Sequence, residues 1–483
     1  MTVTITDEAV NALKAFSTLP HWLSAFMRPE LLEASLRRHV PEIADGRLEL
    51  VEFRADRLRA KGEEWLARCR VIVAEPSMPN REIVLVGNLI PPARPDPVLA
   101  IQTPTPAFGE LGWESYFADL RLHLRVEEVD PGLPALGPLS EPESSARLIE
   151  RILRQGAYPH AIVVSSEPQI ARYKPGSRCT ILYNLTYGPS AVELPNPVIA
   201  KTHQGDKGLV AHEAMSALWD TALAGSDVVL IAEPLGYLPD ERVLLQGPVP
   251  EERTLKLLAR EAFESMTPER LDELRTALGD TARALAALHS SGAQYSRVVT
   301  WPSELDEVRD VLDRLSHSVP GLRSAAEPML LQLLALDQSV AADPVVSAHH
   351  DFRPAQVLLS PGGVAFIDFD GAAMAEPGLD LGRFRGKLRD IGISALAANG
   401  AVLEGDVLQD RLTLLDELCE FFLSEYEACA PVSRERVLVW ETIDLLTALL
   451  HTWTKVRLLR VEPRLAVLLH QLRTVDLRPP QIS

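Results

Sequence analysis

Three side chains with oxygen donors flank a short apolar hairpin in the second half of the chain. Two apolar runs, Val357–Leu359 and Val364–Ile367, are separated by a turn sequence of Ser, Pro and two Gly. Apolar runs on either side of such a turn predict a β-hairpin. Asp351 and Gln356 precede the first run and Asp368 follows the second, so the hairpin should bring all three to one end. Carboxylate and amide oxygens suit magnesium, which favours a few carboxylates together with phosphate oxygens.

The spacing of these residues is similar to the catalytic and metal-binding loops of the aminoglycoside phosphotransferase family. The matching pattern is His349-x-Asp351, then Gln356, then Ile-Asp368-Phe, and it continues into Asp380-Leu-Gly. Members of this family are small-molecule relatives of the protein kinases. The resemblance implies a two-lobed α+β kinase-like fold, with a β-rich small lobe and a helical large lobe.

Roles for the loop residues follow from the same resemblance. Asp351 is expected to orient the acceptor hydroxyl and take its proton, and Asp368 and Gln356 are expected to bind Mg²⁺. Gln356 stands where the family usually has Asn and carries the same amide oxygen on a stem one methylene longer. We interpret it as a variant of the catalytic loop. Asp380 is expected to brace the loop.

A lysine at the end of an apolar run is a candidate nucleotide ligand. Lys201 ends the run Val-Ile-Ala-Lys, and Glu213 lies twelve residues later in a predicted helix. The resemblance implies that Lys201 holds the α- and β-phosphates of ATP and that Glu213 fixes the lysine. A lysine at an exposed strand end beside an unrelated helix would give the same pattern.

The turn Lys174-Pro-Gly176-Ser177-Arg178 lies where kinases place a loop over the phosphates. It holds one glycine, so a Gly-x-Gly-x-x-Gly loop is excluded. The N–H groups of Gly176 and Ser177 are expected to approach phosphate, with charge from Lys174 or Arg178. An ordinary basic hairpin is the alternative.

The segment from Gln246 to Val249 resembles the hinge that offers backbone hydrogen bonds to adenine. It follows a strand-like run over Arg242–Gln246. A plain linker between lobes would have a similar sequence.

Proline-rich stretches divide the chain. Six prolines fall between positions 91 and 106 and four between 131 and 142, too many for regular structure. We expect an accessory α+β domain over residues 1–130, the small lobe over 140–250, and the helical lobe with the catalytic and metal loops over 251–483. Residues 68–74 weakly echo 178–184, so the first domain is either a degenerate copy of the small lobe or shares only a common strand pattern.

Composition narrows the classes of function. The chain has 483 residues, 46% of them apolar, and a net charge of −19, which argues against a nucleic-acid binder because such proteins carry a basic footprint. No apolar run approaches the roughly 18–20 residues of a membrane span. The four cysteines lack metal-ligand spacing, as expected for buried thiols in the cytoplasm.

The sequence therefore predicts an ATP- and Mg²⁺-dependent phosphotransferase. Its acceptor is expected to be a hydroxyl of a small molecule, from the antibiotic, sugar or amino-alcohol classes that the resemblance implies. One alternative is a Ser/Thr kinase that acts on a peptide in natural-product biosynthesis. Another is a kinase-shaped binding partner without turnover, which the Gln356 variant and the missing glycine loop would suit.

Overall fold

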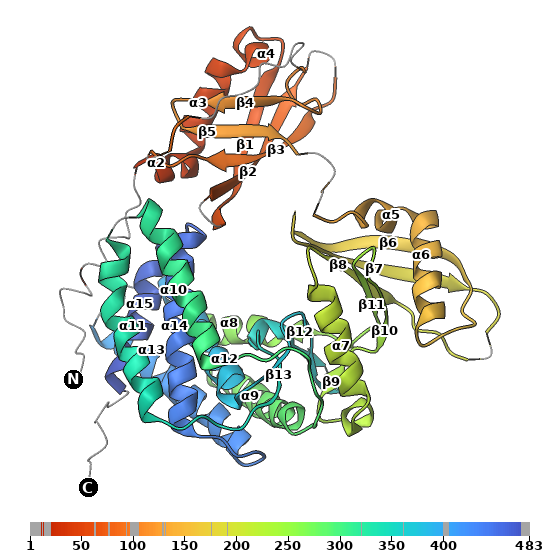
Figure 1. Ribbon diagram of the computed structural model, residues 1–483, viewed down its shortest axis with the longest axis vertical. Coiled ribbons are helices and arrows are strands. Elements are labelled where there is room, and N and C mark those ends of the chain that lie inside the picture. Colours follow the sequence, from red (N-terminus) through yellow and green to blue (C-terminus); the bar gives the residue numbers. More distant parts are fainter. Residues whose placement is uncertain are drawn as a thin grey trace. The chain divides into compact units, whose positions relative to one another are not determined.

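The fold is known from a computed structural model of the chain (Figure 1). It describes residues 11, 13, 21–61, 64–75, 78–92, 94–96, 106–127, 130, 132–174, 176–190, 192–319, 321–360, 362–398 and 405–474.

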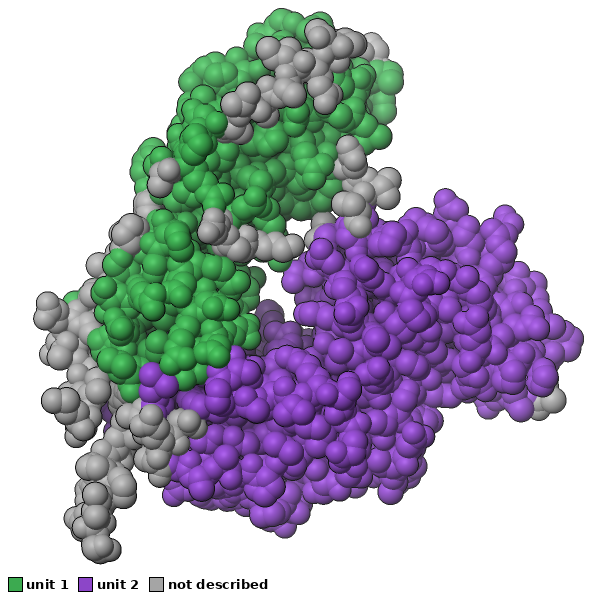
Figure 2. All heavy atoms as spheres, in the orientation of Figure 1, with its two compact units in different colours: residues 1–129, 305–332, 447–462 green, residues 130–304, 333–446, 463–483 purple. Residues whose placement is uncertain are grey.

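The chain divides into two compact units (Figure 2). Unit 1 consists of residues 1–129, 305–332 and 447–462. Unit 2 consists of residues 130–304, 333–446 and 463–483. The first segment of unit 1 ends close to the boundary expected at residue 130. Unit 1 also takes in two later segments that the sequence had placed in the helical lobe.

Unit 1 is built on an antiparallel sheet in the order β1-β2-β3-β5-β4. Its strands are β1 (Glu49–Lys61), β2 (Glu64–Ala74), β3 (Arg81–Leu89), β4 (Glu114–Phe117) and β5 (Leu122–Val126). Every second side chain of β2 is buried, from Trp65 to Val73, which is the period-2 pattern of a strand with one face on a core.

Helices complete unit 1. The short helices of its first segment are α2 (His21–Ser24), α3 (Pro29–His39) and α4 (Pro41–Ala44). The later segments come from α10 (Trp301–Ser318), α11 (Leu322–Ser339) and α14 (Arg434–Thr454). The indole N–H of Trp65 donates to Ser318 Oγ over 2.8 Å in a buried hydrogen bond. This bond joins β2 to α10 across 253 residues of sequence.

The small lobe of unit 2 is an antiparallel sheet in the order β10-β11-β8-β7-β6. Its strands are β6 (Val163–Lys174), β7 (Arg178–Tyr187), β8 (Val198–His203), β10 (Pro234–Leu238) and β11 (Val243–Gln246). Its helices are α5 (Leu136–Ser140), α6 (Pro142–Gln155) and α7 (Lys207–Trp219).

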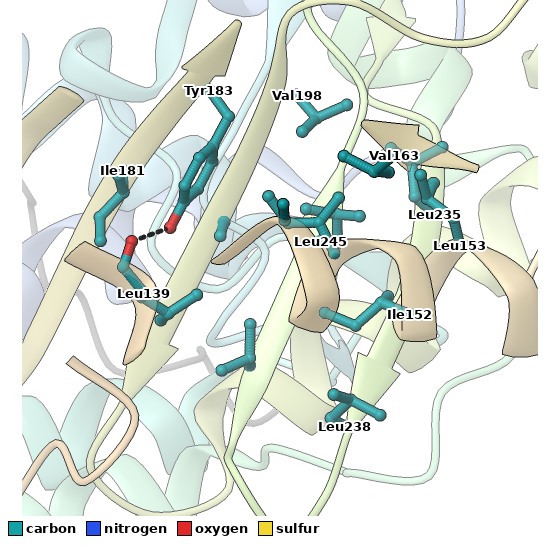
Figure 3. Close-up of a cluster of buried hydrophobic side chains, with 14 of the residues drawn as sticks. Leu139, Ile152, Leu153, Val163, Ile181, Tyr183, Val198, Leu235, Leu238 and Leu245 are labelled. Atoms are coloured by element: carbon teal, nitrogen blue, oxygen red, sulfur yellow. Dashed lines mark hydrogen bonds between the residues drawn. The ribbon is translucent and has the colours of Figure 1, made fainter. Parts of the chain in front are cut away.

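The core of the small lobe lies between this sheet and α6 (Figure 3). Ile152 and Leu153 of α6 belong to the same cluster of buried side chains as Ile181 and Tyr183 of β7. The Tyr183 hydroxyl donates to the carbonyl oxygen of Leu139 over 2.6 Å, so the one polar group of the ring is satisfied inside an apolar core.

The large lobe of unit 2 is mostly helical. Its helices and helical segments are α8 (Leu255–Ser265), α9 (Pro268–His289), α12 (Pro377–Ala398), α13 (Gly405–Glu427), part of α14, and α15 (Val461–Thr474). The start of α9 has the expected local signals: Pro268 is at the first position, and the Thr267 hydroxyl accepts from the N–H of Arg270.

The hairpin predicted from the sequence is present as β14 (Val357–Ser360) and β15 (Gly363–Phe366). It extends into a sheet in the order β12-β14-β15-β9, with β12 (Arg253–Thr254) and β9 (Leu230–Ile231). A second pair, β13 (Val346–Ala348) and β16 (Ala373–Ala375), lies on either side of the hairpin in sequence. The two-lobed α+β fold expected from the sequence is thus confirmed. None of the helices described here is long and apolar enough for a bilayer crossing.

Candidate functional site

The centre of the site is Asp368, which follows β15 with a φ of 75°. Its Oδ1 lies 3.4 Å from Lys201 Nζ, and its Oδ2 lies 3.0 Å from an Arg178 guanidinium nitrogen. Burial alone raises the pKa of this carboxyl, but the charges of Lys201 and Arg178 outweigh burial and lower it below its ordinary value. Asp368 therefore stays ionised.

One amide joins the two carboxylates of the loops. Gln356, the last residue of a 3₁₀ turn (Pro354–Gln356), is buried, and its Nε2 donates to Asp368 Oδ2 over 3.1 Å and to Asp351 Oδ2 over 3.3 Å. Its main-chain oxygen accepts from the N–H of Ile367 over 3.1 Å. The hairpin therefore brings the three residues together at one end, as their spacing predicted.

Asp351 is the most accessible of the three. Its side chain is 37% exposed, whereas that of Asp368 is 11% exposed. Arg353 lies 2.9 Å from Asp351 Oδ2, the same oxygen that Gln356 contacts. Arg353 and Gln356 thus hold Oδ2 of Asp351, while the side chain stays accessible to solvent.

Asp380 braces the loop that leads to Asp351, as predicted. This fully buried carboxylate in the first turn of α12 accepts from the N–H groups of His349 over 2.6 Å and His350 over 2.7 Å. His289 Nε2 lies 3.1 Å away. Burial raises the pKa of Asp380, but the hydrogen bond and charge of His289 lower it overall, so an ionised carboxylate fixes the backbone just before Asp351.

A second brace was not anticipated from the sequence. His350 has a φ of 69°, and its Nε2 lies 3.0 Å from Glu304 on α10. Arg383 of α12 pairs with Glu304 over 3.0 Å and donates to the main-chain oxygen of His350. Burial raises the pKa of Glu304, but His350 and Arg383 together bring it to about 2. Glu304 has no local signal, because its partners lie 46 and 79 residues away.

The small lobe contributes its cations from neighbouring strands. In the register, Thr180 of β7 pairs with Lys201 of β8, and Arg178 pairs with His203. Arg178 also lies 3.5 Å from Asp370, and the buried ring of His203 lies 3.9 Å from that carboxylate. Burial and the charge of Lys201 lower the pKa of His203 to about 4, so its imidazole is neutral at pH 7.

Glu213 does not form the expected ion pair with Lys201 among the described residues. It is exposed on α7 and accepts from Ser296 Oγ over 3.1 Å. α7 buries the face that carries Ala211, Ala214 and Met215, and Glu213 lies off that face because successive helical residues are turned by about 100°. The partner of Lys201 in the structure is Asp368.

Two backbone amides of the turn from Lys174 to Arg178 donate hydrogen bonds to acceptors of this chain. Gly176 has a φ of 61°, and its N–H donates to Asp130 Oδ2 over 2.7 Å. The N–H of Ser177 donates to the main-chain oxygen of Lys174 over 3.0 Å. Both amides that were expected to face phosphate therefore have acceptors within the chain, and Arg178 supplies the charge that reaches Asp368.

The predicted hinge residues follow the sheet of the small lobe. Gln246 is the buried last residue of β11 and pairs with Ile199 of β8. Val249 is half-buried in the segment that leads to β12. Their position between the sheet and α8 is the one expected of a connection between lobes.

Three comparisons relate the chain to known proteins. Residues 212–413 match the phosphotransferase enzyme family. A glucosamine kinase from Streptacidiphilus jiangxiensis is 26% identical over 249 residues, which cover 47% of this chain and 55% of that protein. The chain thus spans about half the length of the curated relative that it matches.

Solved structures with a similar trace include a glucosamine kinase in complex with glucosamine, ADP and inorganic phosphate. It has 16% sequence identity and a TM-score of 0.48, covering 69% of this chain and 88% of that one. Choline kinase LicA from Streptococcus pneumoniae has 14% identity and a TM-score of 0.42, covering 65% and 94%. The match of the family model over residues 212–413 confirms the resemblance to phosphotransferases that the loop motifs indicated.

Proposed function

We propose that the chain is a kinase that transfers the γ-phosphate of ATP to a hydroxyl of a small molecule. The observation that carries the proposal is the Gln356 amide, which links the accessible Asp351 to the buried Asp368. A carboxylate open to an acceptor lies beside one that holds the cations of the small lobe. This juxtaposition is what phosphoryl transfer requires, because its catalysis is mostly positioning and charge stabilisation.

Asp351 is the group proposed to act on the acceptor. Its exposed carboxylate would accept the proton of the attacking hydroxyl as the new oxygen–phosphorus bond forms and the bond from the γ-phosphorus to the bridging oxygen of ADP breaks. Arg353 and Gln356 hold one of its oxygens. Among the described residues no hydrogen bond is found for the other oxygen, which would face the acceptor.

Asp368 and Gln356 would hold magnesium, as the chemistry of this donor set allows. Asp368 is kept ionised, and the side chain of Gln356 beside it also carries an amide oxygen. The described residues contain no group of three or more His, Cys, Asp or Glu that could hold a metal ion by itself. Such a site suits Mg²⁺, which is usually bound by one or two carboxylates plus substrate phosphates. The ion would neutralise the phosphate charge.

Lys201 and Arg178 are proposed to bind the phosphates. Both are held on neighbouring strands and converge on Asp368. The hinge from Gln246 to Val249 would take the adenine through its backbone groups.

For the acceptor, we propose an amino sugar or amino alcohol. The matching relative is named a glucosamine kinase, and choline kinases are among the structures with a similar trace. The chain as a whole carries a net charge of −19. An acidic surface suits a cationic substrate.

The test is a phosphorylation assay with labelled ATP, Mg²⁺ and a panel of amino sugars, amino alcohols and their deaminated analogues. We expect product with an aminated acceptor, and a fall in kcat of about 10²–10⁴-fold in Asp351→Asn, the range for general-base catalysis. Asp310→Asn is the matched control, because Asp310 is exposed on α10. Unchanged turnover in Asp351→Asn, or a wild-type chain that binds no nucleotide with Mg²⁺ present, would refute the proposal.

A further inference from the structure

Asp130, at the start of unit 2, accepts hydrogen bonds at the turn between β6 and β7 of the small lobe. Asp130 is 6% exposed, and its Oδ2 accepts from the N–H of Gly176 over 2.7 Å and from the Tyr173 hydroxyl over 3.0 Å. Its Oδ1 accepts from the N–H of Gly132 over 3.0 Å. The three bonds satisfy both oxygens of a buried charge, as burial of a carboxylate requires.

The backbone at Gly132, just after Asp130, lies close against this turn. A Cβ built on Gly132 would lie 3.1 Å from the Gly176 Cα and 3.2 Å from Asp130 Oδ1, closer than side chains normally approach. Gly176 itself has the left-handed φ of 61° that favours glycine. Two glycines at the closest approach therefore let the segment after Asp130 lie against the turn.

The turn that Asp130 holds leads directly to a cation of the site. Arg178 follows the turn and reaches Asp368 over 3.0 Å and Asp370 over 3.5 Å. The main-chain oxygen of Ser177 accepts from the N–H of Gln204 over 2.8 Å, which joins the turn to the end of β8. The position of the turn therefore sets the position of the Arg178 backbone, from which the guanidinium extends to Asp368 and Asp370.

We propose that Asp130 is a positioning residue for the nucleotide end of the site: it holds the turn from Lys174 to Arg178 in place so that Arg178 can meet the phosphates. The inference rests on the proposed function. The N–H of Gly176 already donates to Asp130. The guanidinium of Arg178 is therefore the group of this turn that would bind the ligand. Asp130 touches none of the reacting groups, and its effect should fall on nucleotide binding.

The experiment compares Asp130→Ala with Asp130→Asn in the full chain, using titration of a fluorescent ATP analogue with Mg²⁺. We expect Asp130→Ala to weaken nucleotide binding about tenfold, because it removes the hydrogen bonds of the carboxylate to Gly132, Tyr173 and Gly176. Asp130→Asn keeps an acceptor for Gly176 and Tyr173 and should recover most of the affinity. In the kinase assay, KM for ATP should rise while kcat changes less than about twofold.

Hydrogen exchange supplies a readout that does not depend on any ligand. The amides of Gly176 and Ser177 should exchange faster in Asp130→Ala than in the wild type, because the turn is released. Glu167→Ala is the matched control, since Glu167 is exposed on the same strand as Tyr173; it should change neither affinity nor exchange. Thermal unfolding of each variant establishes that it is folded.

The outcomes separate the two levels of inference. If the wild-type chain binds no ATP analogue, the proposed function fails. If the wild type binds but Asp130→Ala binds equally well, the positioning role of Asp130 is wrong. If both Asp130 variants bind more tightly, the carboxylate competes with phosphate for Gly176 and does not support the site, which also overturns the proposal.

Discussion

The uncharged side chain of Gln356 links two carboxylates at this site. Its amide donates to two carboxylates at once, and both are functional candidates. A shorter Asn at this position would need a change in the backbone to span the same two oxygens. The longer Gln is therefore matched to the local geometry of the turn Pro354–Gln356.

Replacing Gln356 by Leu should abolish this link at almost constant volume. We expect phosphoryl transfer to fall by at least about 100-fold and the free energy of unfolding to fall by about 1–3 kcal/mol, because Asp351 and Asp368 lose a buried donor. Steady-state kinetics and urea denaturation measure the two effects. Gln169→Leu, at an exposed position of β6, is the control; equal effects in both variants would contradict the assignment.

Glu304 gives the folded state a dependence on acid pH. Its pKa is lowered to about 2 in the fold, from an ordinary value of 4.5, by His350 and Arg383 against the effect of burial. A carboxyl with a lowered pKa stabilises the fold above its unfolded pKa, and this stability is lost as pH falls through the folded pKa. We expect a loss of about 3 kcal/mol between pH 4.5 and 2 that is missing in Glu304→Gln.

The measurement is the free energy of unfolding of both proteins at pH values from 6 to 2. The difference between wild type and Glu304→Gln should shrink as pH falls. A difference that stays constant would show that the ion pairs of Glu304 contribute nothing to the acid limb.

Residue spacing located part of the site and missed the rest for a physical reason. Asp351, Gln356 and Asp368 lie within 18 residues of one another, so a single hairpin brings them together; their roles stay predictions. Arg178 reaches Asp368 across 190 residues, and Glu304 reaches Arg383 across 79. Such contacts depend on how lobes and helices pack, which local patterns do not encode.

At the scale of elements, the hairpin of β14 and β15 was predicted from the sequence, but the side-chain partners of the elements were not. The alternation of β2 and the turn before β15 are local properties of the sequence. The face of α7 is not: a carboxylate twelve residues after Lys201 met the spacing rule, but the helix turned Glu213 to solvent to bury its small apolar face.

Strand β1 of unit 1 carries two arginines on one face. Arg57 and Arg59 alternate with the buried Leu58, and Arg57 pairs in register with Arg68 of β2. Within the part of the chain that the structure describes, no ion pair is found for Arg57 or Arg59. Burial, followed by the charges of Arg59, Arg68 and Arg457, lowers the pKa of Arg57 to about 10. The charged form of Arg57 therefore costs stability at neutral pH.

Replacing Arg57 by Gln should raise the Tm at low salt, because it removes like-charge repulsion while keeping much of the stem. The gain should shrink at high salt, where exposed charges are screened. Thermal unfolding at two ionic strengths measures it. Arg54→Gln is the control and should not raise the Tm, because Arg54 is paired with Glu52 on the same strand. A lower Tm for Arg57→Gln at low salt would refute the prediction.

At the scale of the whole molecule, unit 1 is discontinuous in sequence. Its sheet comes from the first 129 residues, but segments 305–332 and 447–462 belong to the same unit. Trp65 of β2 is fully buried and bonded to Ser318 of α10. The sheet therefore depends on residues that the ribosome makes some 250 positions later.

A fragment of residues 1–129 should consequently fail to fold cooperatively on its own. Without Ser318 and its neighbours, Trp65 would be left with exposed apolar area and an unpaired indole N–H. Circular dichroism during heating should show no sharp transition for the fragment and a clear one for the full chain. A fragment that melts sharply would mean that the first segment is self-sufficient.

Arg178 and Lys201 share the single carboxylate of Asp368, so part of their positive charge is already offset by a group of their own chain. A polyanion that enters here would compete with that carboxylate for the two cations. Its affinity would then depend on the difference between two attractions, that of the cations to the polyanion and that of the cations to Asp368. Added salt weakens both attractions, so the affinity for such a polyanion should depend less on ionic strength than the number of nearby cations suggests.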